Sequence, residues 1–231
     1  MHAVERARTI AELPADERPR ERLVAQGPAA LGDAELVAVL LRTGHPGASA
    51  LEVARALLAS GGGLAGLATA SAASLRRRGL GEAKAASVLA AVELARRLAR
   101  AEVAERPPLA HPAAVAGYLS LRYAVRDQEV MGALFLDSRH RLLADRELFR
   151  GTLSRAAVEP RALLREGLLL GAGGLILFHT HPSGDPSPSA EDLAFTRRMA
   201  EAGEAVGVRL IDHLVVGSVG RWTSLRERGA W

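Results

Sequence analysis

Apolar residues in the first hundred positions recur with the spacing of amphipathic helices, and turn residues separate the apolar stretches. Asp33 is the expected N-cap of the first helix. Ser49 and Glu52 form a capping box ahead of the second. The pattern predicts helices over residues 34–42, 49–58, 72–78 and 82–105. This part of the chain is therefore expected to be all-helical.

The second half of the chain alternates between strand-like and helical patterns. Its first two strands are expected to form a hairpin that turns at residues 138–140. Strands are predicted over residues 130–137, 141–148, 174–181, 208–211 and 214–219, and helices over 159–170 and 189–206. Apolar strands interspersed with helices indicate an α/β (α+β) fold, in which helices flank a mixed sheet.

Three prolines mark the change between the two patterns: Pro107, Pro108 and Pro112. Proline interrupts a helix and favours an extended chain, so these residues indicate a linker. We expect a helical domain over residues 1–106, a linker over 107–112 and a sheet domain over 113–231.

Composition narrows the chemistry that is available to the 231 residues. Cysteine is absent, which excludes disulfides, thiolate zinc sites and cysteine nucleophiles, so histidine, aspartate or glutamate must hold any metal. The longest apolar run covers residues 168–178 and is much shorter than the ~20 residues of a membrane span. The N-terminal segment has no apolar signal core. We expect a cytoplasmic protein without membrane association.

The chemistry is concentrated where the strand over residues 174–181 ends. Alternate side chains of a strand share a face, so His179 and His181 project to the same side. A proline-rich turn then leads to the helix that carries Asp192 in its first turn. Two imidazoles and one carboxylate leave a fourth tetrahedral position open for water, as in catalytic zinc sites. The alternatives are a hydrogen-bonded histidine pair and a capping box in which Ser189 is the N-cap and Asp192 the N3 acid.

The segment over residues 179–192, HTHPSGDPSPSAED, resembles the JAMM motif of MPN-type metalloproteases and, more closely, the RadC family. The resemblance extends to LFRGT at residues 148–152 and DHL at residues 212–214. It implies that zinc is held by His179, His181 and Asp192. It further implies that Ser189 donates a hydrogen bond to the oxyanion at the attacked carbonyl.

The resemblance also implies a glutamate base, for which Glu129 is the best match, with Glu147 and Glu159 as rival candidates. Such a site would hydrolyse an amide in a peptide or protein substrate with water activated by zinc. The substrate cannot be transferred from the family, because little room remains for an insertion that grips a ubiquitin-like modifier. His213 is interpreted as a residue behind the ligands or in the core.

Two further residue groups complete this interpretation. Asp212 is a possible but not a favoured extra ligand, because the three-residue set is already complete. The remaining histidines are interpreted as incidental residues of loops and termini: His2, His45, His111 and His140.

A basic turn in the helical half suggests a second function. Gly79 and Gly81 lie within a helix-hairpin-helix-like turn, surrounded by Arg76, Arg77, Arg78 and the single lysine, Lys84. Amides at a helix N-terminus attract phosphate, so the turn is a candidate for binding DNA backbone without reading bases. The alternative is a plain αα-hairpin with solvated arginines. The competing function is therefore a non-catalytic, DNA-associated accessory protein, and the resemblance to the RadC family implies a role in repair or recombination. The net charge of +4 is compatible with either.

Overall fold

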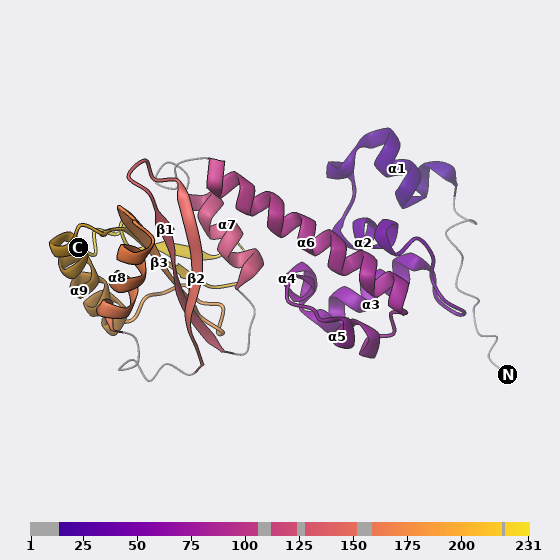
Figure 1. Cartoon of the computed structure of the whole chain (residues 1–231). Coiled ribbons are helices and arrows are strands. Elements are labelled where there is room, and N and C mark those ends of the chain that lie inside the picture. Colours follow the sequence, from indigo (N-terminus) through magenta and orange to yellow (C-terminus); the bar gives the residue numbers. More distant parts are fainter. Residues whose placement is uncertain (1–13, 106–111, 124–127, 152–158, 219) are drawn as a thin grey trace. The chain divides into compact units, whose positions relative to one another are not determined.

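A computed structural model describes residues 14–105, 112–123, 128–151, 159–218 and 220–231 (Figure 1). The elements follow the order η2 (Ala15–Glu17), α1 (Pro19–Gln26), η3 (Pro28–Ala30), α2 (Asp33–Leu41), α3 (Ala50–Gly61), α4 (Gly63–Ala68), α5 (Ala72–Arg77), α6 (Glu82–Glu105), α7 (Pro112–Arg122), β1 (Glu129–Leu136), β2 (Leu142–Gly151), α8 (Pro160–Leu169), β3 (Gly174–Thr180), α9 (Ala190–Val206), β4 (Arg209–Val216) and β5 (Trp222–Ser224). This order confirms the predicted α/β class, with helices first and a helix-flanked sheet second.

The N-terminal unit is helical and has a core of its own. Apolar side chains from α2 to the first part of α6 form this core, among them Leu41, Leu57, Leu75 and Val88, all at most 2% exposed. Helix α3 begins at the predicted capping box, where the Glu52 amide donates to Ser49 Oγ. The buried stripe of each short helix is stabilised mainly by this packing, because isolated helices of such length are marginal in water.

The sheet has five strands in the order β2-β1-β3-β4-β5. β1 pairs antiparallel with both β2 and β3, β3 pairs parallel with β4, and β4 pairs antiparallel with β5. The parallel pair requires a crossover, which α9 provides between β3 and β4. The carboxyl end of β3 and the N-terminus of α9 are therefore joined only by the proline-rich turn of the motif.

Each face of the sheet is covered, which produces two cores. α8 and α9 cover one face and pack against Phe135, Leu175 and Leu177, while α7 covers the other face (Figure 1). Strand β3 is buried along its whole length, as expected for a strand with helices on both faces. Its side chains alternate between the two cores, and this alternation decides which face receives His179.

Two of the predicted strands are one strand in the structure. Residues 208–211 and 214–219 were expected to be separate strands, but β4 runs through Asp212 and His213 without interruption. Both polar side chains are buried and have hydrogen-bond partners, among them Ser224 for Asp212 and Thr196 for His213. Because their polar groups are satisfied, the strand continues where the apolar pattern is broken.

The helices also differ from the prediction, in the N-cap of α2 and in α7, where no helix was predicted. Gly32, not Asp33, is the N-cap of α2; Glu35 Oε2 accepts from the Gly32 amide at 3.0 Å. Pro112, which we assigned to the linker, is the first residue of α7, a position that suits proline because its missing amide hydrogen would have no helical partner. Linker residues 107–111 lie outside the described residues.

The compact units divide between Leu94 and Ala95, inside α6, rather than at the prolines. The reason is that Ala99 and Val103, in the second half of α6, pack into the same core as Tyr118 and Leu119 of α7. The end of α6 is therefore part of the sheet unit.

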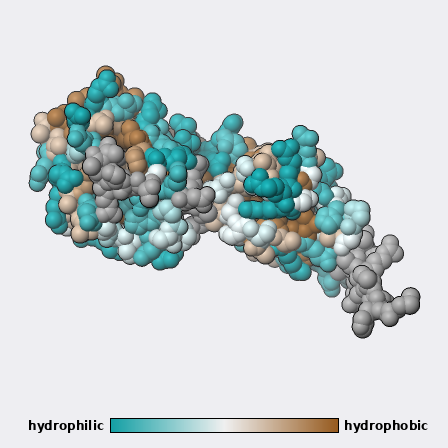
Figure 2. All heavy atoms as spheres, turned by 90° about the horizontal axis from the view of Figure 1, so that it is seen from below, coloured by the Kyte–Doolittle hydropathy of each residue, from teal (hydrophilic) through white to brown (hydrophobic). Residues whose placement is uncertain are grey.

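The surface in Figure 2 shows hydrophilic side chains interspersed with smaller hydrophobic areas. Within the described ranges, every helix is too short or too polar to cross a lipid bilayer.

Candidate metal centre

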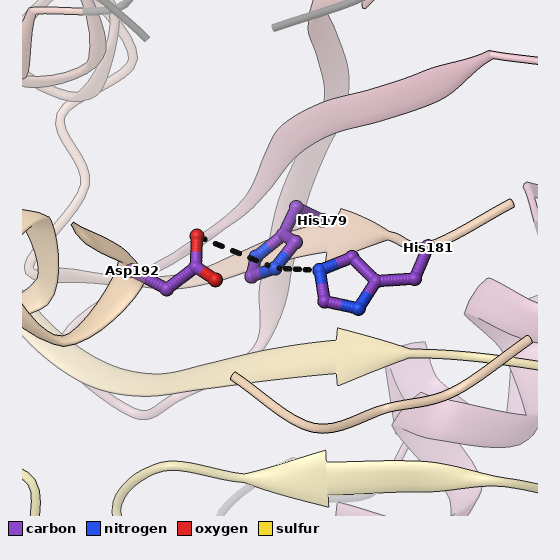
Figure 3. A group of neighbouring side chains, drawn as sticks. All are labelled: His179, His181 and Asp192. Carbon is purple, nitrogen blue, oxygen red and sulfur yellow. Dashed lines mark hydrogen bonds and ion pairs between the residues drawn. The ribbon is translucent and has the colours of Figure 1, made fainter. Parts of the chain in front are cut away.

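The three predicted metal ligands meet where β3 ends (Figure 3). His179 is the second-to-last residue of β3, and His181 follows the strand directly. Asp192 lies in the first turn of α9. In β3, His179 continues the row of Leu175 and Leu177, so its ring points to the face that α9 covers. One potential ligand atom from each residue lies within 4.8 Å of the other two.

The ligand atoms face one another closely. His179 Nε2 is 3.0 Å from His181 Nε2 and 3.6 Å from Asp192 Oδ1. His179 is fully buried and Asp192 is 5% exposed, whereas His181 is half-buried. The centre thus combines two buried ligands with a third at its edge.

The donor set of this cluster fits a cation. His181 Nδ1 lies 2.7 Å from the Asp185 carbonyl oxygen, which can only accept, so this nitrogen carries the proton of the neutral ring. The other nitrogen, Nε2, therefore presents a lone pair toward His179. Two facing imidazole nitrogens at 3.0 Å require a proton or a metal ion between them, and a nearby carboxylate adds negative charge. Zn²⁺ commonly takes this combination of ligands.

The capping box of α9 holds the carboxylate of Asp192 in place. Asp192 Oδ2 accepts from the Ser189 amide at 2.7 Å and from Ser189 Oγ at 2.5 Å. In return, the Asp192 amide donates to Ser189 Oγ at 3.2 Å. Oδ2 is thus used by the cap, while Oδ1 is the oxygen that faces His179. The capping and ligand interpretations of Asp192 are compatible, because each uses a different oxygen.

His213 lies directly behind His179. His179 Nδ1 is 2.8 Å from His213 Nε2, and His213 Nδ1 is 2.7 Å from Thr196 Oγ1. Burial holds the pKa of His213 well below the usual histidine value, with smaller contributions from His179 and His181. His213 is therefore a neutral ring that contacts a ligand from behind, one of the two roles that the sequence left open for it. The involvement of Thr196 was missed, although its position one helical turn after Asp192 was a usable signal.

Comparison with known families agrees with these features. Residues 109–230 match the model of the RadC-like JAB domain, and residues 10–86 match the UPF0758 N-terminal model. This chain belongs to the RadC (UPF0758) family. The resemblance noted in the motif is thereby confirmed over both parts of the chain, and the sheet unit is a RadC-like JAB domain whose His-His-Asp group could hold a metal ion.

RadC-family relatives align with nearly the whole chain. A UPF0758 protein of Halorhodospira halophila is 49% identical over 222 residues, which are 96% of this chain and 99% of the relative. A UPF0758 protein of Methylibium petroleiphilum is 49% identical over 219 residues, 94% of this chain and 98% of the relative. One of Roseiflexus castenholzii is 43% identical over 221 residues, 95% and 94% of the two chains.

Glu129 begins β1 beside the centre. Met131 of β1 lies opposite His179 of β3, and the Val130 amide donates to Thr180 Oγ1 at 3.0 Å. Continuing this antiparallel register by two more pairs brings Glu129 opposite His181, and residues two apart on a strand share a face. The register thus favours Glu129 as the glutamate nearest to the ligands.

The rival glutamates are engaged elsewhere. Glu147 lies on β2, which β1 separates from β3, and its carboxylate accepts two hydrogen bonds from Arg150 at 2.5 and 2.6 Å. Glu159 precedes α8 and forms an ion pair with Arg161 at 2.7 Å. Both carboxylates are thus engaged in ion pairs at the surface.

Asp212 faces the side of the sheet that is opposite to the ligands. It lines a cavity of about 280 Å³ together with Ile176 and Leu214. Its carboxylate accepts from Ser224 Oγ and from the amides of His213 and Arg226, so it fastens the C-terminal segment to β4. Of the four remaining histidines, His45 and His140 belong to turns, and His2 and His111 lie outside the described residues.

The basic turn of the N-terminal unit is more closely packed than expected. Lys84 Nζ donates to the Gly44 carbonyl oxygen at 2.7 Å, and Arg78 is half-buried, with its Nη1 close to Gly61. Gly79 and Gly81 are exposed, as are Arg76 and Arg77. Lys84 therefore has a structural partner, which makes the two arginines the better candidates for phosphate contacts. DNA binding by this turn stays a prediction.

Proposed function

We propose that this protein is a zinc-dependent hydrolase of amide bonds, acting as a peptidase or isopeptidase on a peptide or protein substrate. The observation that carries the proposal is the convergence of His179, His181 and Asp192 at the end of a buried strand. The RadC-like JAB domain supports the same reaction class. Three protein ligands leave room in a tetrahedral shell for water or substrate, which distinguishes catalytic from structural zinc sites.

Within this proposal, the protein residues have separate tasks. Bound zinc would lower the pKa of a water molecule and polarise the scissile carbonyl. The Glu129 carboxylate accepts the proton that the water loses as its oxygen adds to the carbonyl carbon. Glu129 then delivers this proton to the leaving nitrogen as the C–N bond breaks. The products are a carboxylic acid and an amine, with no covalent intermediate on the protein.

Ser189 has a second task in the proposal. Its hydroxyl lies at the N-terminus of α9, where it donates to Asp192 Oδ2. The same hydroxyl would turn to the substrate oxyanion as negative charge develops there. A hydrogen bond that forms only in the transition state accelerates the reaction without tightening substrate binding.

Two variants separate metal binding from catalysis. His179→Ala should lose zinc, measured by elemental analysis of the purified protein, together with hydrolysis of a library of fluorogenic peptide amides. Glu129→Gln should keep its zinc and lose hydrolysis by at least about 10²-fold, the usual contribution of an acid–base residue. Glu147→Gln is the matched control, because it neutralises a strand carboxylate away from the centre and should keep both properties. Equal zinc contents in His179→Ala and the parent would refute the ligand set, and a fully active Glu129→Gln would refute the base.

A further inference from the structure

A chain of buried hydrogen bonds runs from the backbone of α9 to the ligand His179. Thr196 Oγ1 lies 2.6 Å from the Asp192 carbonyl oxygen and 2.7 Å from His213 Nδ1, and His213 Nε2 lies 2.8 Å from His179 Nδ1. Thr196, His213 and His179 are each 0% exposed. Solvent therefore cannot supply alternative partners to these three side chains, and the contacts among them decide where the protons lie.

The direction of every bond in this chain follows from its first member. A carbonyl oxygen has no proton, so the 2.6 Å contact requires Thr196 to donate its single hydroxyl proton to Asp192. Thr196 can then only accept from His213, which places the proton of the neutral His213 ring on Nδ1. The lone pair of His213 is consequently on Nε2, and His179 Nδ1 must donate to it.

The last consequence concerns the metal-binding atom. A neutral imidazole has one proton, so a donating Nδ1 leaves the lone pair of His179 on Nε2. This is the nitrogen that faces His181 and Asp192. If Thr196 did not fix His213, the His213 proton could move to Nε2, and His179 would then accept on Nδ1 and carry its own proton on Nε2, where it blocks a metal.

We propose that Thr196 and His213 are positioning residues that fix His179 in the tautomer required for metal binding. The inference rests on the proposed function in one respect, since it takes the His-His-Asp cluster as the metal centre. It adds that α9 acts on two of the candidate ligands. The helix carries Asp192 itself, and the Asp192 carbonyl oxygen fixes the tautomer of His179 through Thr196 and His213. Helix and strand are thereby coupled through one continuous set of hydrogen bonds.

The first test reads the tautomers directly in the full-length, zinc-free protein. Long-range ¹H–¹⁵N correlation spectra of the imidazoles, recorded above the pKa of free histidine, distinguish protonated from bare ring nitrogens. We expect His213 and His179 to carry their protons on Nδ1. In Thr196→Val, which keeps the side-chain shape without the hydroxyl, the His213 Nδ1 signal should lose its protonated character in part or in full. A parent protein with the His213 proton on Nε2 would overturn the proposal.

The second test measures zinc affinity by competition with a chelator. Thr196→Val should bind zinc about 10- to 100-fold more weakly, the range found when partners of metal-binding histidines are removed. Thr196→Ser keeps the hydroxyl and should restore most of the affinity. Thr223→Val is the matched control, because Thr223 is also buried but lies on β5. Thr196→Ala serves in the same comparison if valine prevents folding, which circular dichroism would reveal.

The two tests separate this inference from the proposed function. If the parent binds zinc and a folded Thr196→Val binds it as tightly as Thr196→Ser does, the positioning role is refuted and the metal centre stands. If the parent binds no zinc but shows the expected tautomers, and these change in Thr196→Val, the hydrogen-bond chain is supported and the hydrolase proposal fails.

Discussion

Replacing Ser189 with alanine distinguishes a helix cap from a residue of the candidate metal centre, because α3 begins with a capping box that also pairs a serine with an N3 carboxylate. In both boxes the N3 amide donates to the serine oxygen at 3.2 Å, and the serine amide donates to the N3 carboxylate, at 2.6 Å for Ser49–Glu52 and 2.7 Å for Ser189–Asp192. Ser189 makes one further bond, from its hydroxyl to Asp192 Oδ2.

The difference in hydrogen bonding sets the expected magnitudes. Loss of an N-cap serine costs about 1 kcal/mol, so Ser49→Ala should lower the free energy of unfolding of the N-terminal unit by that amount. Ser189→Ala loses the same cap and also a hydrogen bond to a charged group, which contributes about 1.5 kcal/mol or more. We therefore expect Ser189→Ala to cost about 2–3 kcal/mol in the sheet unit. It should also weaken zinc binding by about tenfold, because Asp192 loses a partner that orients it.

Hydrogen exchange read by mass spectrometry suits this comparison, since the two caps lie in different compact units and peptides report on each unit separately. Zinc affinity is measured on the same samples by chelator competition, and Ser49→Ala should leave it unchanged. Ser189→Thr keeps the hydroxyl and should retain both stability and affinity. If Ser189→Ala costs no more than Ser49→Ala and binds zinc like the parent, Ser189 acts only as a cap and the reasoning is refuted.

Three other features give independent predictions. The two tyrosines of the chain, Tyr118 and Tyr123, both donate to the buried Asp145. Burial raises the pKa of each tyrosine above its usual value of 10.0. No tyrosinate absorbance should therefore develop in the folded protein as the pH passes that value. Because the folded state keeps protons that the unfolded state releases, the free energy of unfolding should fall as the pH rises above 10.0. Tyrosinate absorbance that rises near this pH before the protein unfolds would contradict the burial argument. Lys84→Ala should lower the free energy of unfolding of the N-terminal unit by about 1.5 kcal/mol, because the hydrogen bond to Gly44 is lost. The double variant Arg76→Ala, Arg77→Ala should change this free energy by no more than about 0.5 kcal/mol and should reduce the salt dependence of any DNA binding. The reverse pattern would indicate that Lys84, and not the two arginines, contacts phosphate. If free zinc is first present at a hundred times its dissociation constant, its removal by a chelator should lower the free energy of unfolding by about 2.7 kcal/mol. The same chelator should have no such effect on His179→Ala.

The convergence of His179, His181 and Asp192 was predictable because their arrangement depends on local geometry. Alternation along a strand places His179 and His181 on one side, and the capping signal of Ser189 and Asp192 defines where the next helix begins. Only a short turn separates the two elements, so the chain has little freedom to move them apart. The same local rules gave the bounds of α6 and the position of the β1–β2 hairpin.

The features that the sequence left open depend on pairing between distant segments. His213 reaches His179 because β4 pairs parallel with β3, with Leu177 beside His213 and His179 beside Val215. Parallel pairing through a crossover helix has no short-range signal comparable to a hairpin turn. Helix α7 was not predicted at all. Pro112 follows two other prolines and was interpreted with them as linker, although proline also favours the first turn of a helix.

The misplaced break in β4 shows how polar residues inside an apolar strand carry information. Asp212 and His213 interrupt the hydrophobic pattern, and a polar pair in a strand buried on both faces is destabilising unless each group finds a partner. The structure provides those partners on opposite faces, Ser224 and the Arg226 amide for Asp212, and Thr196 with His179 for His213. Two buried polar side chains in one central strand are costly to assemble, so their presence indicates specific tasks on each side. On one face the task is to anchor the C-terminal segment. On the other it is to hold the ring of His179, which is why His213 belongs to the candidate metal centre rather than to the core.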